Sequence, residues 1–200
     1  MPKIMIDATI AKVKGFLLNP VETFQQTKGD DPKTVFIYFA VLLFIFSLLS
    51  AIVTATGMDS MFGSAFPITG DPISGGIFLL FISSFIGVFI STLILTVWLH
   101  LWVYIFGGRN GIMQTLKALL YGSTPGLLFG WIPFIGILFS IWSLVLGILG
   151  IRELQDLSTA RAVVITLIAV VIPIVVLVLL FVLVLSFFVV GDVFVTETLY

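Results

Sequence analysis

The chain contains no cysteine and little charge. The absence of cysteine from its 200 residues excludes disulfides, thiol catalysis, cysteine metal sites and palmitoyl or prenyl anchors. Only 10% of the residues are charged, whereas charged residues make up about a quarter of ordinary soluble domains, and 60% are hydrophobic. The composition therefore predicts an integral membrane protein, and the length leaves room for a single domain, residues 1–200.

Side chains that carry chemistry inside membranes are also scarce. None of the ten acidic residues lies in a predicted span, although transporters and channels commonly bury one there. The single histidine, His100, is interpreted as a polar residue at headgroup level, with a proton relay as the alternative. Ser123 does not lie in a G-x-S-x-G elbow. We therefore expect no enzyme, no catalytic residue, no cofactor, no metal site and no nucleic-acid partner.

The basic residues that are present fall on alternate sides of the hydrophobic segments. Basic residues near spans are retained in the cytoplasm, so this pattern predicts a cytoplasmic N-terminus and a C-terminus outside. The long side chain of one of them, Lys117, is expected to reach the membrane interface. The nine residues are Lys3, Lys12, Lys14, Lys28, Lys33, Arg109, Lys117, Arg152 and Arg161.

The hydrophobic runs predict an all-α integral membrane protein with five transmembrane helices. The uncharged stretch 118–151 is divided into two spans at a turn between Pro125 and Pro133, because a single span there would place the next two arginines outside. The last span contains Pro173 and is long enough to tilt, kink or overhang. The predicted spans cover about 34–57, 77–104, 113–128, 132–151 and 162–190.

Residues 1–33 are predicted to form a cytoplasmic head that begins with a short amphipathic interfacial helix. Apolar side chains recur there with helical spacing, and Lys3, Lys12 and Lys14 are expected to contact anionic lipid headgroups. A solvated linker is the alternative. The apolar stripe consists of Ile6, Ile10, Val13 and Leu17.

Two helix starts are predicted near the end of this head. Asn19 is followed directly by a proline, and Glu22 lies three residues after Asn19. This spacing predicts a capping box. Asp31 followed by proline repeats the start signal at the first span.

Small residues recur along three of the spans, and in lipid such residues let helix backbones approach closely. They predict that spans two, three and four pack together, and that the last span faces lipid. A homodimer contact is the alternative. The candidate packing residues in spans three and four are Gly122, Gly126, Gly130, Gly136, Ser140, Ser143, Gly147 and Gly150.

The stretch from Tyr121 to Gly136, with Pro125 and Pro133, Trp142 and the Arg152-Glu153 pair after the fourth span, resembles the Yip domain family. These are five-pass membrane proteins named in eukaryotes for interaction with Ypt/Rab GTPases. The resemblance implies a cytoplasmic N-terminus, five helices, no established enzymatic activity, and a role in vesicle traffic among eukaryotic members.

The chain lacks the Asp-Leu-Tyr-Gly-Pro-like motif and the longer head of eukaryotic members, so it is similar to a compact prokaryotic relative in the cell membrane. The short head offers little surface for a Rab-type GTPase. We expect a non-enzymatic protein that organises membrane or binds lipids, other membrane proteins or a second copy of itself. The alternative function is a transporter or permeation path for a small or lipidic solute between spans two, three and four.

Overall fold

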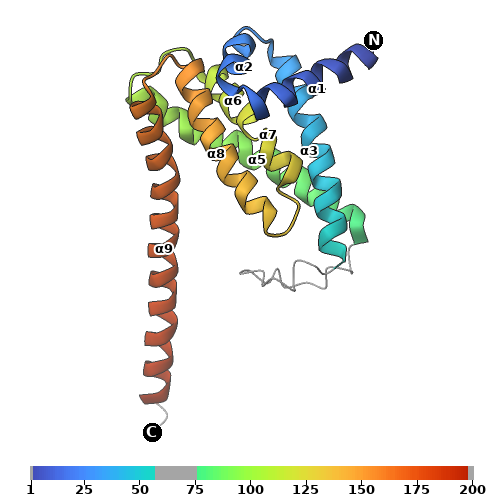
Figure 1. Cartoon of the computed structure of the whole chain (residues 1–200). Helices are drawn as coiled ribbons and strands as arrows, with labels where there is room; N and C mark the ends of the chain where they lie inside the picture. Colours follow the sequence, from blue (N-terminus) through green and yellow to red (C-terminus); the bar gives the residue numbers. More distant parts are fainter. Residues whose placement is uncertain (1, 57–75, 198–200) are drawn as a thin grey trace.

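The computed structural model describes residues 2–56 and 76–197, with side chains described for 7–56 and 76–187. All the regular secondary structure of the described residues is helical. Figure 1 shows the helices, which in chain order are α1 (Pro2–Leu18), α2 (Pro20–Thr27), α3 (Pro32–Ala55), α5 (Gly76–Ile105), α6 (Ile112–Gly122), α7 (Thr124–Phe129), α8 (Ile135–Leu154) and α9 (Thr159–Glu197).

Four of these helices are long and apolar enough to cross a membrane: α3, α5, α8 and, within α9, residues Thr159–Phe187. The predicted span at about 113–128 instead consists of α6, with 11 residues, and α7, with 6. Ser123 separates the two helices, and Pro125 lacks the N–H that a continuous helix would donate to the Tyr121 carbonyl, which accepts from Thr124 Oγ1 instead.

The segments that carry lysine and arginine gather at one end of the molecule, here called the polar end (Figure 1). This end comprises α1, α2, the start of α3, and the two connections α5–α6 and α8–α9. Helix α9 runs away from it and ends far from the N-terminus. Helices α3 and α9 run away from the polar end, and α5 and α8 run toward it, with α6–α7 leading from the end of α5 to the start of α8.

Helix α8 is the centre of the packing. Helices α6, α7, α2 and α9 all pack against it, while α5 packs against α3, α6 and α9. The predicted contact between spans three and four therefore occurs through α6, α7 and α8. The main neighbours of α5 include α3, which the small-residue pattern did not indicate.

Helix α9 differs from the purely lipid-facing span expected from its sequence. Its first turns are part of the core, with Ala162 and Ile165 fully buried, and Trp98 Nε1 donates a hydrogen bond to the Ala169 carbonyl at 2.9 Å. The following residues, 174–187, are exposed along the part of α9 that projects beyond the other helices (Figure 1). The helix continues through Pro173.

One predicted helix start is confirmed and the other is wrong in detail. The Asp31 side chain accepts a hydrogen bond from the Thr34 N–H at 3.1 Å and caps α3. Asn19 occupies the N-cap position of α2, but its side chain makes no capping hydrogen bond. Instead, the Thr23 hydroxyl donates to the Asn19 carbonyl at 2.8 Å, so the chain turns from α1 into α2 without a capping box.

Helix α1 lies across the polar end and is fastened there by one aromatic side chain (Figure 1). Phe16 is fully buried and contacts the rings of Phe24 and Tyr121 at centroid distances of 4.8 and 4.9 Å. Of the predicted apolar stripe, Val13 packs against the core and Ile10 is 47% exposed. Phe16, which lies outside the predicted stripe, therefore holds α1 against the bundle.

We expect Gly150→Ala to destabilise the fold by about 1–3 kcal/mol, the usual cost of overpacking. A methyl group there would lie 2.9 Å from the Phe24 ring and 3.0 Å from Ala118 Cα, so α8 would be pushed from both α2 and α6. Thermal unfolding of the detergent-solubilised protein, followed by tryptophan fluorescence, measures the effect.

Gly87→Ala is the matched control, because nothing lies within 4 Å of the added methyl group on α5. Replacing this helical glycine is expected to leave stability unchanged or raise it by about 0.5–1 kcal/mol. Equal loss of stability in both variants would contradict the close packing of α8.

Candidate functional site

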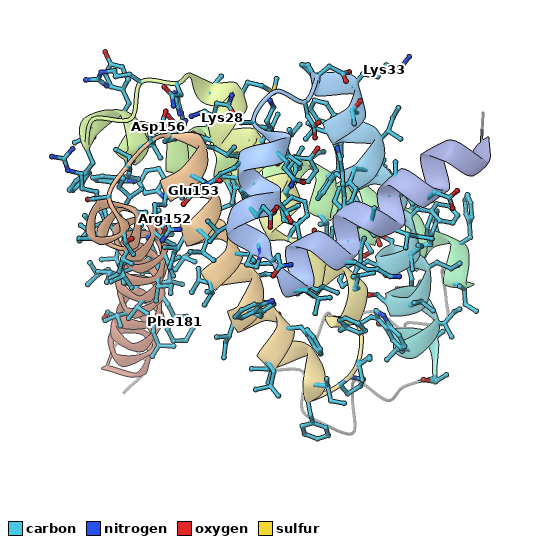
Figure 2. The ribbon with its side chains drawn as sticks, turned by 45° about the horizontal axis from the view of Figure 1, so that its top comes forward. Lys28, Lys33, Arg152, Glu153, Asp156 and Phe181 are labelled. Carbon is cyan, nitrogen blue, oxygen red and sulfur yellow. The ribbon has the colours of Figure 1, made fainter. Side chains whose placement is uncertain are left out.

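Polar side chains at the polar end converge on residues 28–31, which connect α2 to α3. We call these four residues and the side chains bound to them the head junction. Helices α1 and α6 and the connection from α8 to α9 each supply a partner, so the junction joins the N-terminal head to the helical body (Figure 2).

The backbone of the junction is held by α6. The Lys28 carbonyl accepts hydrogen bonds from Gln114 Nε2 at 3.2 Å and from Lys117 Nζ at 2.8 Å. Lys117 is only 3% exposed, so the head covers an ammonium group that the sequence places at the membrane interface. A buried cation needs such partners because transfer out of water is costly for an unpaired charge.

The Lys28 side chain connects the junction to the end of α8. Its Nζ lies 2.7 Å from both carboxylate oxygens of Asp156, which also accepts a hydrogen bond from Asn110 Nδ2 at 2.6 Å (Figure 2). The Lys28 ammonium and the Asn110 amide stabilise the charged carboxylate and lower the pKa of Asp156 below its usual range. Alongside, Gln25 Nε2 donates to Glu153 at 2.8 Å.

Asp30 links the junction to α1 and α6 together. Its carboxylate lies 2.5 Å from Lys12 Nζ and accepts a hydrogen bond from the Tyr121 hydroxyl. Lys12 Nζ also donates to that hydroxyl at 3.2 Å. The Tyr121 ring is fully buried and lies edge-on to the Tyr38 ring, at a centroid distance of 5.1 Å. The ion pair of Lys12 and Asp30 therefore lies next to buried aromatic rings.

A second chain of hydrogen bonds fixes the α5–α6 and α8–α9 connections. Gln155 Nε2 donates to the Gly111 carbonyl at 2.9 Å and to Thr115 Oγ1 at 3.0 Å, and Thr115 Oγ1 lies 2.8 Å from His100 Nδ1. Because Thr115 accepts from Gln155, its own proton is available to the histidine. His100 thus makes an interhelical contact with α6.

This arrangement binds segments of the chain to one another. Ser123 donates its hydroxyl proton to the Leu120 carbonyl at 2.8 Å, whereas His100 bonds Thr115, so the two do not form a nucleophile and base pair. Within residues 7–56 and 76–187 there is no group of three or more histidine, aspartate or glutamate side chains placed to hold a metal ion.

The predicted packing residues of α6 and α7 approach α8 at backbone distance. A Cβ atom added to Gly122 would lie 3.0 Å from the Gly147 nitrogen. The Gly126 N–H donates to Ser143 Oγ at 2.8 Å. Gly150 faces α2 and α6, as described above. Gly147 differs from these, because a Cβ atom there would meet nothing within 4 Å.

The remaining motif residues surround the α7–α8 turn. Gly130 and Gly136 lie together, since an added Cβ at Gly136 would be 2.4 Å from the Gly130 carbonyl oxygen. Pro125 is buried and Pro133 is half-buried. Two other positions, Ser140 and Trp142, are exposed on α8, and the Ser140 hydroxyl donates to the Gly136 carbonyl at 2.9 Å.

The three predicted headgroup lysines have different surroundings. Lys12 is engaged by Asp30 and Tyr121, whereas Lys14 is exposed on α1. The side chain of Lys3 lies outside the described residues. Sequence reasoning missed Asp30 and Tyr121 as the partners of Lys12, because they are 18 and 109 residues away and no local pattern joins them.

The fold and its polar end define the class: an all-helical membrane protein whose apolar helices share one charged end. The family model of the Yip1 domain matches residues 14–193, and the chain belongs to this family. The resemblance inferred from the paired prolines and Trp142 is therefore confirmed. No curated protein and no solved structure matched the chain.

We expect Asp30→Asn to lower the free energy of unfolding by about 2 kcal/mol, between the values for exposed and fully buried ion pairs. The substitution keeps the size of the side chain and removes the charge beside Lys12, where the two side chains are 22% and 21% exposed. Equilibrium unfolding in mixed micelles with increasing dodecyl sulfate measures the loss.

Asp156→Asn is the control, since its pair with Lys28 is more exposed, at 65% and 39%. It is expected to cost less than about 1 kcal/mol. A cost equal to that of Asp30→Asn would show that burial does not distinguish the two ion pairs.

Proposed function

We propose that this protein is a non-enzymatic integral membrane protein that crosses the membrane five times, with its polar end in the cytoplasm. There it binds anionic lipid headgroups and so organises the surrounding membrane, in a prokaryotic cell membrane. Membership of the Yip1 domain family supports the membrane assignment. The basis of the proposal is that some basic side chains of the polar end are paired or buried, whereas others are exposed.

The basic residues whose side chains the structure describes divide into an engaged set and an exposed set. Lys12, Lys28 and Arg152 pair with carboxylates, and Lys117 is buried under the head. The exposed set has no carboxylate partner among the described residues and consists of Lys14, Lys33, Arg109 and Arg161. The first set holds the head in place, and the second presents positive charge at the end of the apolar helices.

This exposed set is the observation that carries the proposal. A charged residue beside an apolar span lies at headgroup level, where each cation near an anionic surface contributes about 1 kcal/mol. Figure 2 shows Lys33 pointing away from the body. The guanidinium of Arg109 lies 3.9 Å from the Tyr104 ring centroid and is thereby held at the surface beside the end of α5.

Five crossings follow from the direction of the helices if the polar end is on one side of the membrane. Helices α5 and α8 both end at the polar end, and α8 begins at the opposite end (Figure 1). The chain between them, α6–α7, must therefore cross in the other direction. Helices α6 and α7 are short, and both pack against α8.

The absence of cysteine allows this topology to be tested with single introduced cysteines. We expect Phe134→Cys, in the α7–α8 turn, to react with a membrane-impermeant maleimide in intact cells. Gly29→Cys, in the head junction, should react only after lysis. Both positions are accessible, since Phe134 is 64% exposed and a side chain at residue 29 meets nothing within 4 Å.

Labelling of both cysteines only after lysis would contradict the five-span proposal. In that case α6, α7 and α8 would enter and leave the membrane on the same side. The cysteine-free parent chain serves as the background control.

To test lipid binding, the full chain in detergent is mixed with phosphatidylglycerol or with phosphatidylcholine. Native mass spectrometry then counts the lipid molecules that the protein retains. We expect the double variant Lys14→Gln/Arg161→Gln to weaken binding of phosphatidylglycerol roughly thirtyfold, from about 1 kcal/mol for each cation. Binding of phosphatidylcholine should not change.

The double variant Lys28→Gln/Asp156→Asn is the control. It removes a lysine from the same end without changing net charge, so binding of phosphatidylglycerol should remain as in the parent. If the parent protein retained both lipids equally, the headgroup proposal would be wrong.

The partners proposed beyond lipid are other membrane proteins or a second copy of the chain. The projecting part of α9 is the surface that offers such a contact, since its Val, Leu and Phe side chains are exposed, including Phe181 at 65%. Co-purification of proteins from native membranes would identify such a partner.

A further inference from the structure

A cavity of about 200 Å³ lies between α5, α6, α8 and α9. It is separate from the head junction and from the exposed basic residues. Most of its wall consists of apolar side chains. The residues that define it include Leu95 and Trp98 of α5, Leu119 of α6, Gly147 of α8, and Thr166 and Ala169 of α9.

Gly147 leaves this space open. The residue is buried, yet a Cβ atom added there would meet no atom within 4 Å. Gly122 approaches the backbone of Gly147 from α6, so the glycine has a contact on one face and a void on the other. At this position the small residue creates volume inside the bundle, which close packing alone does not require.

The walls of the cavity are held together by hydrogen bonds, and each polar side chain in the lining has a hydrogen-bond partner. Trp98 Nε1 donates to the Ala169 carbonyl and thereby ties α5 to α9 across the cavity. The two hydroxyls in the lining are occupied, since Ser143 Oγ accepts from the Gly126 N–H and Thr166 Oγ1 donates to the Ala162 carbonyl. An apolar cavity of this kind excludes water and accepts hydrocarbon.

The cavity opens toward the outer surface of the helices. Three of its lining residues are exposed: Leu95 at 51%, Leu144 at 42% and Val170 at 41%. In a membrane, these side chains face the hydrocarbon core. The cavity is smaller than the roughly 300–1,000 Å³ of sites for whole ligands, but larger than the roughly 150 Å³ cavity that admits benzene.

We propose that this cavity is a lateral binding site for one acyl chain of a bilayer lipid. The surrounding solvent supplies the ligand, the apolar wall excludes water, and the volume takes part of a single chain. The apolar wall also argues against a route for a polar solute at this place. The site recognises the hydrocarbon chain, so it does not depend on the headgroup binding proposed above.

The test uses the full chain reconstituted in phosphatidylcholine nanodiscs that contain a phosphatidylcholine with a diazirine on its acyl chain. After illumination, mass spectrometry locates the labelled residues. We expect label on the interior residues Leu119 and Ala169, in addition to the exposed rim at Leu95. Label on the rim alone would show ordinary surrounding lipid and would overturn the proposal.

Gly147→Leu fills the cavity and should abolish interior labelling while rim labelling persists. Gly87→Leu is the matched control: the same substitution on a glycine with open space around it, on α5 outside the cavity, should leave interior labelling unchanged. Unchanged interior labelling in Gly147→Leu would also overturn the proposal.

Ala169→Leu provides a second way to fill the cavity if Gly147→Leu does not fold. Ala169 is 8% exposed and lines the cavity from α9. Thermal unfolding of each variant separates loss of the site from loss of the fold. The neutral probe lipid makes the outcome independent of the exposed lysines and arginines, so this proposal and the headgroup proposal fail separately.

Discussion

The close approach of α6 to α8 is the contact on which the rest of the structure depends. Lipid tails are as apolar as leucine, so helices in a membrane gain little from burying apolar surface and associate through backbone proximity and hydrogen bonds. Gly122 lies against the backbone of Gly147, and the Gly126 N–H bonds Ser143. This contact holds two helices that are individually too short to cross a membrane, and it also positions the α7–α8 turn.

The head is joined to this helical body by charge as well as by packing. Lys117 lies on α6 beneath the head and donates to the Lys28 carbonyl, while the carboxylate of Asp30 lies close enough to interact with its charge. Removal of the head would therefore leave a cation without its partner at the edge of the apolar region. The N-terminal helices complete the polar end and cannot be regarded as an independent appendage.

Much of the helical layout could be predicted from the sequence because uncharged runs and helix-start signals are local. The Asp31 cap and the turn between Pro125 and Pro133 are examples. The tertiary contacts could not be predicted in this way. Tyr121 meets Asp30 across 91 residues, and the burial of Phe16 depends on rings supplied by other helices.

The head junction has a consequence for the order of assembly during synthesis. Its lysine pairs with Asp156 and its neighbour Gln25 bonds Glu153, each 128 residues later in the chain. Residues 20–31 therefore leave the ribosome long before their partners exist, and contacts of such high sequence separation form late. The contacts of residues 20–31 with Glu153 and Asp156 are completed only after α8 has been inserted.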